Sequence, residues 1–111
     1  MEDNLDNNEL EVDIIREKLN NRKVDWTKHC LNRLQQRDIS MTDVKKAVNN
    51  GQIIEYYYDD TPYPSCLICG NTDNNTAVHI VCGVSHESIH MITAYYPDEE
   101  QWEDSMRRRR E

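Results

Sequence analysis

The chain has 111 residues, with 21 acidic and 13 basic side chains and a formal net charge of −8. This length allows one domain with a modest core, and the sequence contains no apolar run of 18 residues that could span a membrane. An acidic protein repels the RNA backbone on the whole, so any nucleic-acid contact has to be local. The acidic, Asn-rich start is unlike an export signal, and we therefore expect a cytoplasmic location.

Residues 1–21 form an acidic extension with seven acidic and two basic side chains. We expect this extension to be partly disordered, above all in its first eight positions, and partly helical. Four apolar residues recur near helical spacing and predict a short helix over 9–20: Leu10, Ile14, Ile15 and Leu19. Residues 22–111 are expected to form a single α+β domain.

Two further helices are predicted after this extension. The first covers 28–37, where Cys30 and Leu34 lie on one apolar face, and it ends at Asp38. The second begins after Ser40, which is a typical N-cap residue, and ends at Gly51, where a helix C′ glycine belongs.

The hydrophobic period changes to two after the second of these helices, which is typical of strands. Four strands are predicted, at 52–58, 65–70, 77–84 and 88–96, and a helix is predicted from 98 to 110. The sequence therefore predicts an α+β fold in which helices pack on one face of a four-stranded antiparallel sheet.

The segment His86-Glu87-Ser88-Ile89-His90 matches the H-E-x-x-H signature of zinc proteases. That signature needs a helix, where residues four apart share a face and two imidazoles can bind one zinc ion. Here His86 falls in a predicted turn and His90 in a predicted strand, where extended backbone separates them by about 13 Å. We interpret the match as accidental and expect no metal site.

The four cysteines are expected to be reduced thiols because no export signal accompanies them. Cys66 and Cys69 have C-x-x-C spacing, but no second pair of ligands lies at zinc-finger distance. Buried apolar packing is the favoured interpretation for them. A metal-binding domain built on this pair and the four histidines stays an alternative.

The helix predicted at 28–37 carries a second stripe of functional interest. His29, Arg33 and Arg37 are spaced four residues apart and therefore follow one edge of the helix. A histidine can transfer a proton near neutral pH, and arginine can bind phosphate with two hydrogen bonds, as cleavage of a phosphodiester requires. The alternative is a solvated edge whose arginines pair with carboxylates from the strands.

The ordered blocks of the sequence resemble the bacterial domain-of-unknown-function family 4258. The resemblance extends from about residue 24 to 110 and rests on these segments: His29-x3-Arg33-x3-Arg37, Ile54-Glu55-Tyr56, Tyr63-Pro64-Ser65-Cys66-Leu67, Ile92-Thr93-Ala94-Tyr95-x-Pro97-Asp98 and Trp102. This family is grouped with RelE/ParE-like toxins, which are small α+β domains. The resemblance implies a toxin of a toxin–antitoxin system that cleaves RNA without a metal or another cofactor.

The resemblance also implies roles for individual residues. His29 would be the general acid or base, Arg33 and Arg37 would clamp the phosphate, and Tyr95 would position or deprotonate a ribose 2′-hydroxyl. Packing against Trp102 is the alternative for Tyr95. RNA and a zinc-finger-type antitoxin protein are the implied partners.

A second class of function stays open. In it the chain is a non-catalytic protein-interaction domain, its histidine–arginine stripe is an ion-paired structural edge, and the sheet binds a protein partner. The charge distribution bears on this choice, because residues 47–100 contain eight acidic side chains and no basic one. Such a surface weakens contact with RNA.

Overall fold

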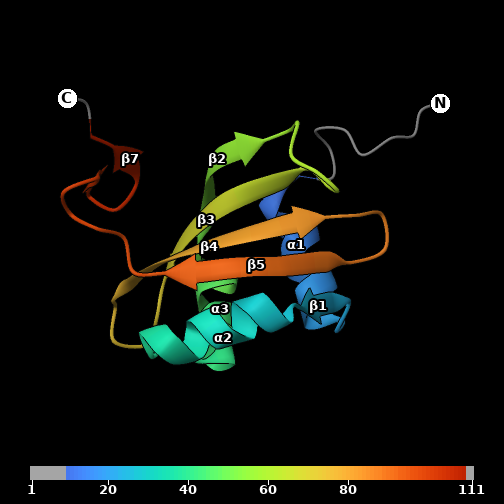
Figure 1. Cartoon of the computed structure of the whole chain (residues 1–111), viewed down its shortest axis with the longest axis horizontal. Helices are drawn as coiled ribbons and strands as arrows, with labels where there is room; N and C mark the ends of the chain where they lie inside the picture. The colour runs from blue at the N-terminus through green and yellow to red at the C-terminus, as the bar shows by residue number, and fades with distance from the viewer. Residues whose placement is uncertain (1–9, 110–111) are drawn as a thin grey trace.

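The computed structural model describes residues 10–109 and shows an α+β domain (Figure 1). Three helices precede most of the strands. In chain order the elements are α1 (Val12–Asn20), β1 (Val24–Trp26), α2 (Lys28–Arg37), α3 (Met41–Asn50), β2 (Gln52–Tyr57), β3 (Ser65–Asn71), β4 (Ala77–Val84), β5 (Ile89–Tyr95), β6 (Trp102–Glu103) and β7 (Arg107–Arg108). No described helix is long and apolar enough to cross a membrane.

The sheet has five strands in the order β1-β5-β4-β3-β2, and β6 and β7 form a separate hairpin. The prediction of a four-stranded antiparallel sheet is therefore wrong, although the α+β class is correct. The difference is β1, which pairs in parallel with β5 from Val24 opposite Ile89 to Trp26 opposite Met91. A strand of three residues is too short to show a period of two, so the sequence pattern did not reveal it.

The predicted C-terminal helix is also wrong, because the described part of that segment forms the hairpin β6–β7. Two residues in its turn, Asp104 and Ser105, have φ angles of 53° and 65°. This left-handed backbone does not occur inside a right-handed helix. The aromatic anchor of the hairpin is Trp102, whose side chain is 3% exposed.

The central helices begin and end as the sequence predicts. The Thr27 hydroxyl accepts a hydrogen bond from the backbone N–H of Cys30 at the start of α2, and left-handed Asp38 ends that helix. Ser40 and Asp43 form both hydrogen bonds of a capping box at the start of α3. These local bonds satisfy donors that a helix start leaves unpaired.

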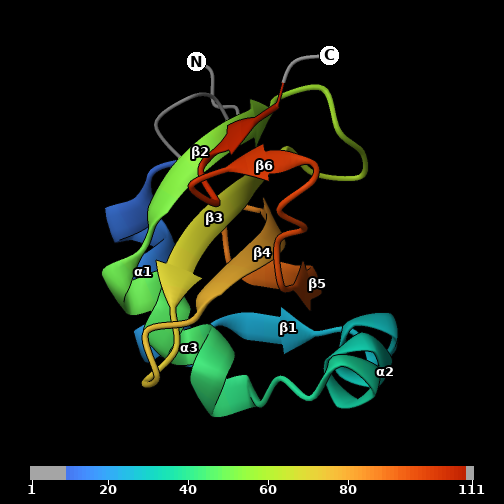
Figure 2. The ribbon, with the colours of Figure 1, turned by 90° about the vertical axis from the view of Figure 1, so that its left-hand side faces the viewer.

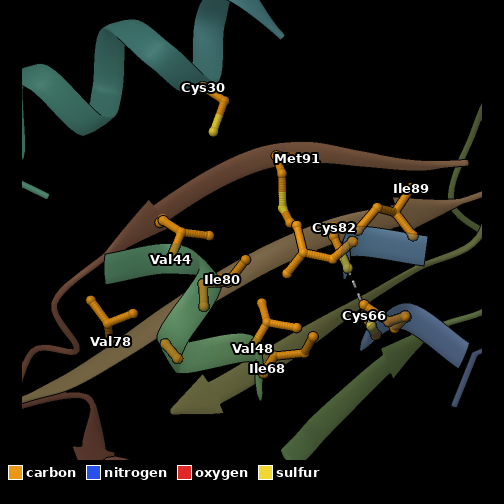
Figure 3. Packing of buried hydrophobic residues seen from close by; sticks show 14 of the residues in the cluster. Cys30, Val44, Val48, Cys66, Ile68, Val78, Ile80, Cys82, Ile89 and Met91 are labelled. Atoms are coloured by element: carbon orange, nitrogen blue, oxygen red, sulfur yellow. Dashed lines mark hydrogen bonds between the residues drawn. The ribbon is translucent and has the colours of Figure 1, made fainter. Parts of the chain in front are cut away.

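The core lies between the helices and one face of the sheet (Figure 3). Alternate residues of β4 point into it, among them Val78, Ile80 and Cys82. All four cysteines are buried free thiols, as the favoured interpretation expected, and the Sγ atoms of Cys66 and Cys82 lie 3.9 Å apart.

The predicted N-terminal helix is present as α1, and it contributes to the core through its buried residues Ile15 and Leu19, beside Leu10 just before the helix. Arg16 joins α1 to the end of α3 because its guanidinium donates to the carbonyl oxygens of Val48 and Gly51. The Val48 carbonyl also accepts from the backbone N–H of Gly51 at 3.4 Å, so Arg16 adds hydrogen bonds at an end where a helix leaves carbonyls under-satisfied. Figure 2 shows α1 and α3 on one side of the sheet and the β6–β7 hairpin on the other.

Candidate functional site

The site of interest lies on the face of the sheet that the helices leave uncovered. Because Val78, Ile80 and Cys82 point into the core, the residues between them point the other way. His79 is paired with Tyr95 of β5, and Val81 with Thr93. We call the surface formed by these two pairs the far face.

Arg37 reaches this surface from the last turn of α2, which packs along β5 (Figure 1). Its Nη1 atom donates to the Thr93 hydroxyl at 3.0 Å and to the carbonyl oxygen of Ala94 at 2.8 Å. Within residues 10–109 the guanidinium forms no ion pair. A half-buried positive charge, held by neutral groups, therefore lies at the edge of the far face.

His79 and Tyr95 form a hydrogen-bonded pair in the middle of the site. The Nε2 atom of His79 lies 2.6 Å from the carbonyl oxygen of Ser105, which can only accept, so this nitrogen carries the proton. In the neutral ring Nδ1 is then an acceptor, and the Tyr95 hydroxyl, 3.4 Å away, donates to it. The tautomer of His79 is thus fixed by its two partners.

The pKa values of this pair favour neutral side chains at pH 7. Burial lowers the pKa of His79, whose side chain is completely buried. Burial also raises the pKa of Tyr95, against the opposing effect of the positive charges of Arg108 and Arg37. Tyr95 is therefore a hydrogen-bonding phenol and not a phenolate.

A second arginine approaches the far face from the β6–β7 hairpin. Arg108 donates from Nε and Nη2 to the Glu55 carboxylate at 2.8 and 3.2 Å, and its guanidinium lies 4.6 Å from the centre of the Trp102 ring. Trp102 packs edge-on against His79 with ring centres 4.5 Å apart. Although burial acts to raise it, the hydrogen bonds from Arg108 and Tyr57 lower the pKa of Glu55.

The four predicted catalytic residues do not converge on one point. Arg37 and Tyr95 are close together, because Arg37 binds Thr93 and Ala94 immediately before Tyr95. His29 is exposed and lies eight residues before Arg37, about 12 Å away along the axis of α2.

Arg33 lies between His29 and Arg37 and donates to the side chain of Gln36 at 2.9 Å. The alternative prediction was that Arg33 and Arg37 pair with acids from the strands. No such ion pair occurs in the described region. Glu55 of β2 binds Arg108 instead.

The alternative prediction for Tyr95 was packing against Trp102. The structure instead brings both rings next to His79. His79 lies next to both rings, with centres 5.3 Å from Tyr95 and 4.5 Å from Trp102. Sequence reasoning missed Arg108 as a partner of this group because it placed the terminal arginines on a helix. The available signal was the arginine run after Trp102.

The positions of His86 and His90 agree with the sequence interpretation. His86 is in the bend before β5, and His90 is inside β5 and paired with Gly83. Across residues 10–109, no three side chains of His, Cys, Asp or Glu come together in a way that could hold a metal ion.

This is an α+β domain with an arginine-flanked Tyr95 on the far face of its sheet. The model of the family described as "Domain of unknown function (DUF4258)" matches residues 26–96, more than half of the chain, and the chain belongs to this family. The match includes Arg37 and Tyr95 but leaves out α1 and the β6–β7 hairpin, so it is narrower than the resemblance seen in the sequence. No curated protein and no solved structure matches the chain.

Proposed function

We propose that this protein is the toxin component of a toxin–antitoxin system and cleaves RNA without a metal ion. A relationship to the RelE/ParE-like toxins and a cytoplasmic location are parts of the same proposal. The observation that carries it is the position of Arg37, a guanidinium without a carboxylate partner in the described region, held beside Tyr95 by Thr93 and Ala94. Such a group can bind one phosphate of an RNA backbone in spite of the net charge of −8.

The chemistry needs no group beyond the RNA and the protein. The ribose 2′-oxygen forms a bond to phosphorus, and the bond from phosphorus to the 5′-oxygen of the next nucleotide breaks. Arg37 neutralises the charge that develops on the phosphate oxygens. The Tyr95 oxygen accepts the proton of the 2′-hydroxyl while its own proton passes to Nδ1 of His79, and the reverse transfer protonates the leaving 5′-oxygen.

His29 and Arg33 extend the positive edge along α2. Since about 12 Å separates His29 from Arg37, we assign His29 and Arg33 to neighbouring parts of the RNA backbone and the reaction itself to Arg37 and Tyr95. Backbone contacts of this kind position RNA without reading its sequence.

The test compares expression of the wild type, Arg37→Ala, Tyr95→Phe and His29→Ala while RNA integrity is followed in the same cultures. We expect the wild type to arrest growth and fragment RNA, and Arg37→Ala to reduce cleavage by about 100-fold or more. Lys45→Ala removes an exposed positive charge from α3 and should behave as the wild type. Equal RNA integrity with wild type and Arg37→Ala, both folded by circular dichroism, would exclude this proposal.

A non-catalytic interaction domain is the second candidate, and one observation favours it. Tyr56 and Tyr58 stack on each other, with ring centres 5.4 Å apart, and remain 47% and 48% exposed at the β2 edge of the sheet. Tyrosine is enriched in protein interfaces. The partner there would be a zinc-finger-type antitoxin if the chain is a toxin, and another protein if it is not. Replacing both tyrosines by serine should weaken that complex, and it should leave any RNA cleavage unchanged.

A further inference from the structure

A separate pocket lies beside β5, toward the start of that strand and away from Tyr95. It has a volume of about 320 Å³ and is lined by Asp25, Thr27, Pro62, Tyr63, His90 and Ile92, among others. This volume is at the lower end of the range for small-molecule sites, roughly 300–1,000 Å³, and suits one planar group. We call it the His90 pocket.

One wall of the His90 pocket is flat and aromatic. The rings of Tyr63 and His90 are stacked at 4.5 Å with an angle of 6° between their planes. The imidazole is held from both ends, by the Asp25 carboxylate at Nδ1 and the Ser85 hydroxyl at Nε2, each at 3.3 Å. An immobilised aromatic wall of this kind stacks against nucleobases.

The polar group at the mouth of the His90 pocket is a carboxylate. The side chain of Asp25 is 59% exposed, and only its Oδ2 atom has a hydrogen-bond partner among the described residues. Each carboxylate oxygen has two acceptor sites, so Asp25 can accept two further hydrogen bonds while it keeps His90 in place. A ligand that fits must present two adjacent N–H donors on a planar edge.

Among the RNA bases, guanine has this edge, through its N1–H and its 2-amino group. Adenine and cytosine offer one amino group beside an acceptor, and uracil offers one N–H between two acceptors. We propose that the His90 pocket binds a guanine base of the RNA substrate. This inference rests on the proposed function and deepens it, since it assigns a base preference to the cleavage of the proposed RNA substrate.

The location of the pocket fits a base near the cleavage site. His90 and Tyr95 lie on the same strand, and five residues of extended chain span about 16 Å. The guanine would therefore flank the nucleotide at which Arg37 and Tyr95 act. Unpaired bases of single-stranded RNA are accessible in the way that this contact requires.

The experiment titrates the full chain with guanosine, inosine and adenosine 5′-monophosphates and follows backbone amide shifts by NMR, with inorganic phosphate as the control. Because all three nucleotides carry the same phosphate, differences report the base. We expect guanosine monophosphate to bind about tenfold more tightly than adenosine monophosphate, with shifts at Gly83 and His90. Inosine monophosphate, which lacks the 2-amino group, should lie between them.

Three variants make the test specific. Asp25→Asn replaces one acceptor by a donor and should abolish the preference for guanine, whereas Asp73→Asn, in the β3–β4 turn, should keep it. Gly83→Ala places a methyl group on the pocket wall, 3.8 Å from atoms of Tyr63 and Ile92, which is ordinary contact. This variant should fold normally and bind all three nucleotides more weakly.

The outcomes separate this inference from the proposed function. Equal affinity for the three nucleotides, or an unchanged guanine preference in Asp25→Asn, would overturn the assignment of the pocket even if the protein cleaves RNA. Selective binding of guanosine monophosphate in the pocket would support it even if the protein leaves RNA intact.

Discussion

The Tyr95 hydroxyl donates a hydrogen bond to Nδ1 of His79 across the β4–β5 pair, and the carbonyl of Ser105 holds the other nitrogen of the same ring. Tyr95, which we propose takes part in RNA cleavage, is therefore held by a histidine that has no contact with solvent. The hairpin that contributes Ser105 is part of this arrangement.

The buried histidine predicts how stability depends on pH. Burial lowers the pKa of His79 below its usual 6.5, so at pH values below 6.5 the unfolded chain binds a proton that the folded protein does not. This contribution to the free energy of unfolding is complete above pH 6.5. It is lost as the pH falls toward the pKa of His79 in the folded protein, by about 1.4 kcal/mol for each unit between the unfolded and folded pKa values.

His79→Gln removes this proton-binding group. Urea unfolding of both proteins at pH 7.5 and 5.5 should show a smaller loss of unfolding free energy in His79→Gln than in the wild type. The same loss in both proteins would mean that another group causes the pH dependence.

We expect Arg108 to stabilise the β6–β7 hairpin. Arg108→Ala removes two hydrogen bonds to Glu55 and the contact with the Trp102 ring. Since Arg108 is largely exposed, we expect a loss of only about 0.5–1 kcal/mol in unfolding free energy. Trp102 fluorescence, measured in a Trp26→Phe background, should shift to longer wavelength as the hairpin loosens.

The matched control is Arg107→Ala, which changes the neighbouring arginine of β7. Among the described residues Arg107 has one ion pair, to Glu103 at 3.7 Å, and both partners are exposed. Its removal should leave the emission of Trp102 unchanged. A shift of the same size in both variants would show that the charge of the strand, and not the contact with Glu55 and Trp102, holds the hairpin.

The sequence predicted those parts of the fold whose signals are local. The capping box of Ser40 and Asp43 depends on residues three apart, and the strand periods of β3 to β5 depend on alternate positions, so both could be recognised. The parallel pairing of β1 with β5 could not, because it joins segments 65 residues apart and β1 has only three residues.

The positions of the candidate site residues were likewise predictable only where the signal is local. The helical spacing of Arg33 and Arg37 correctly places them on one edge of α2, but the spacing does not show that only Arg37 reaches β5. Arg108 was missed because the backbone of Asp104 and Ser105 turns the terminal segment into a hairpin. Gly51 was expected as the C′ glycine of α3, and the structure places it at the C-cap with a φ of −97°. It is required because a β carbon there would lie 2.5 Å from the carbonyl oxygens of Ala47 and Cys69.

Helix α1 contributes to the core although it lies outside the residues that the family model matches. Ile15 is completely buried, whereas its neighbour Ile14 is half-buried. Ile15→Ala should therefore lower the unfolding free energy by about 2–5 kcal/mol. Ile14→Ala is the control and should have a clearly smaller effect in the same urea titration. Equal effects would mean that α1 is not packed through Ile15.

Helix α3 approaches the sheet closely where it crosses β3, and this approach depends on Gly70. A β carbon at Gly70 would overlap the backbone of Ala47, including its carbonyl oxygen and Cα atom. Neither backbone can move alone, because Ala47 is inside a hydrogen-bonded helix and Gly70 pairs with Val78 in the sheet. Gly70→Ala must therefore separate the helix from the sheet, which opens the core next to Ala47 and Val48.

We expect Gly70→Ala to lose about 3 kcal/mol or more of unfolding free energy, at the upper end of the usual cost of overpacking. Gly83→Ala is the matched control, since it adds the same methyl group to the neighbouring strand, where the nearest atom is 3.7 Å away. Thermal unfolding followed by circular dichroism compares the two. If Gly70→Ala melts at the same temperature as the wild type, α3 can move away from β3 without loss of stability. The close approach at Gly70 would then not be what holds the helix on the sheet.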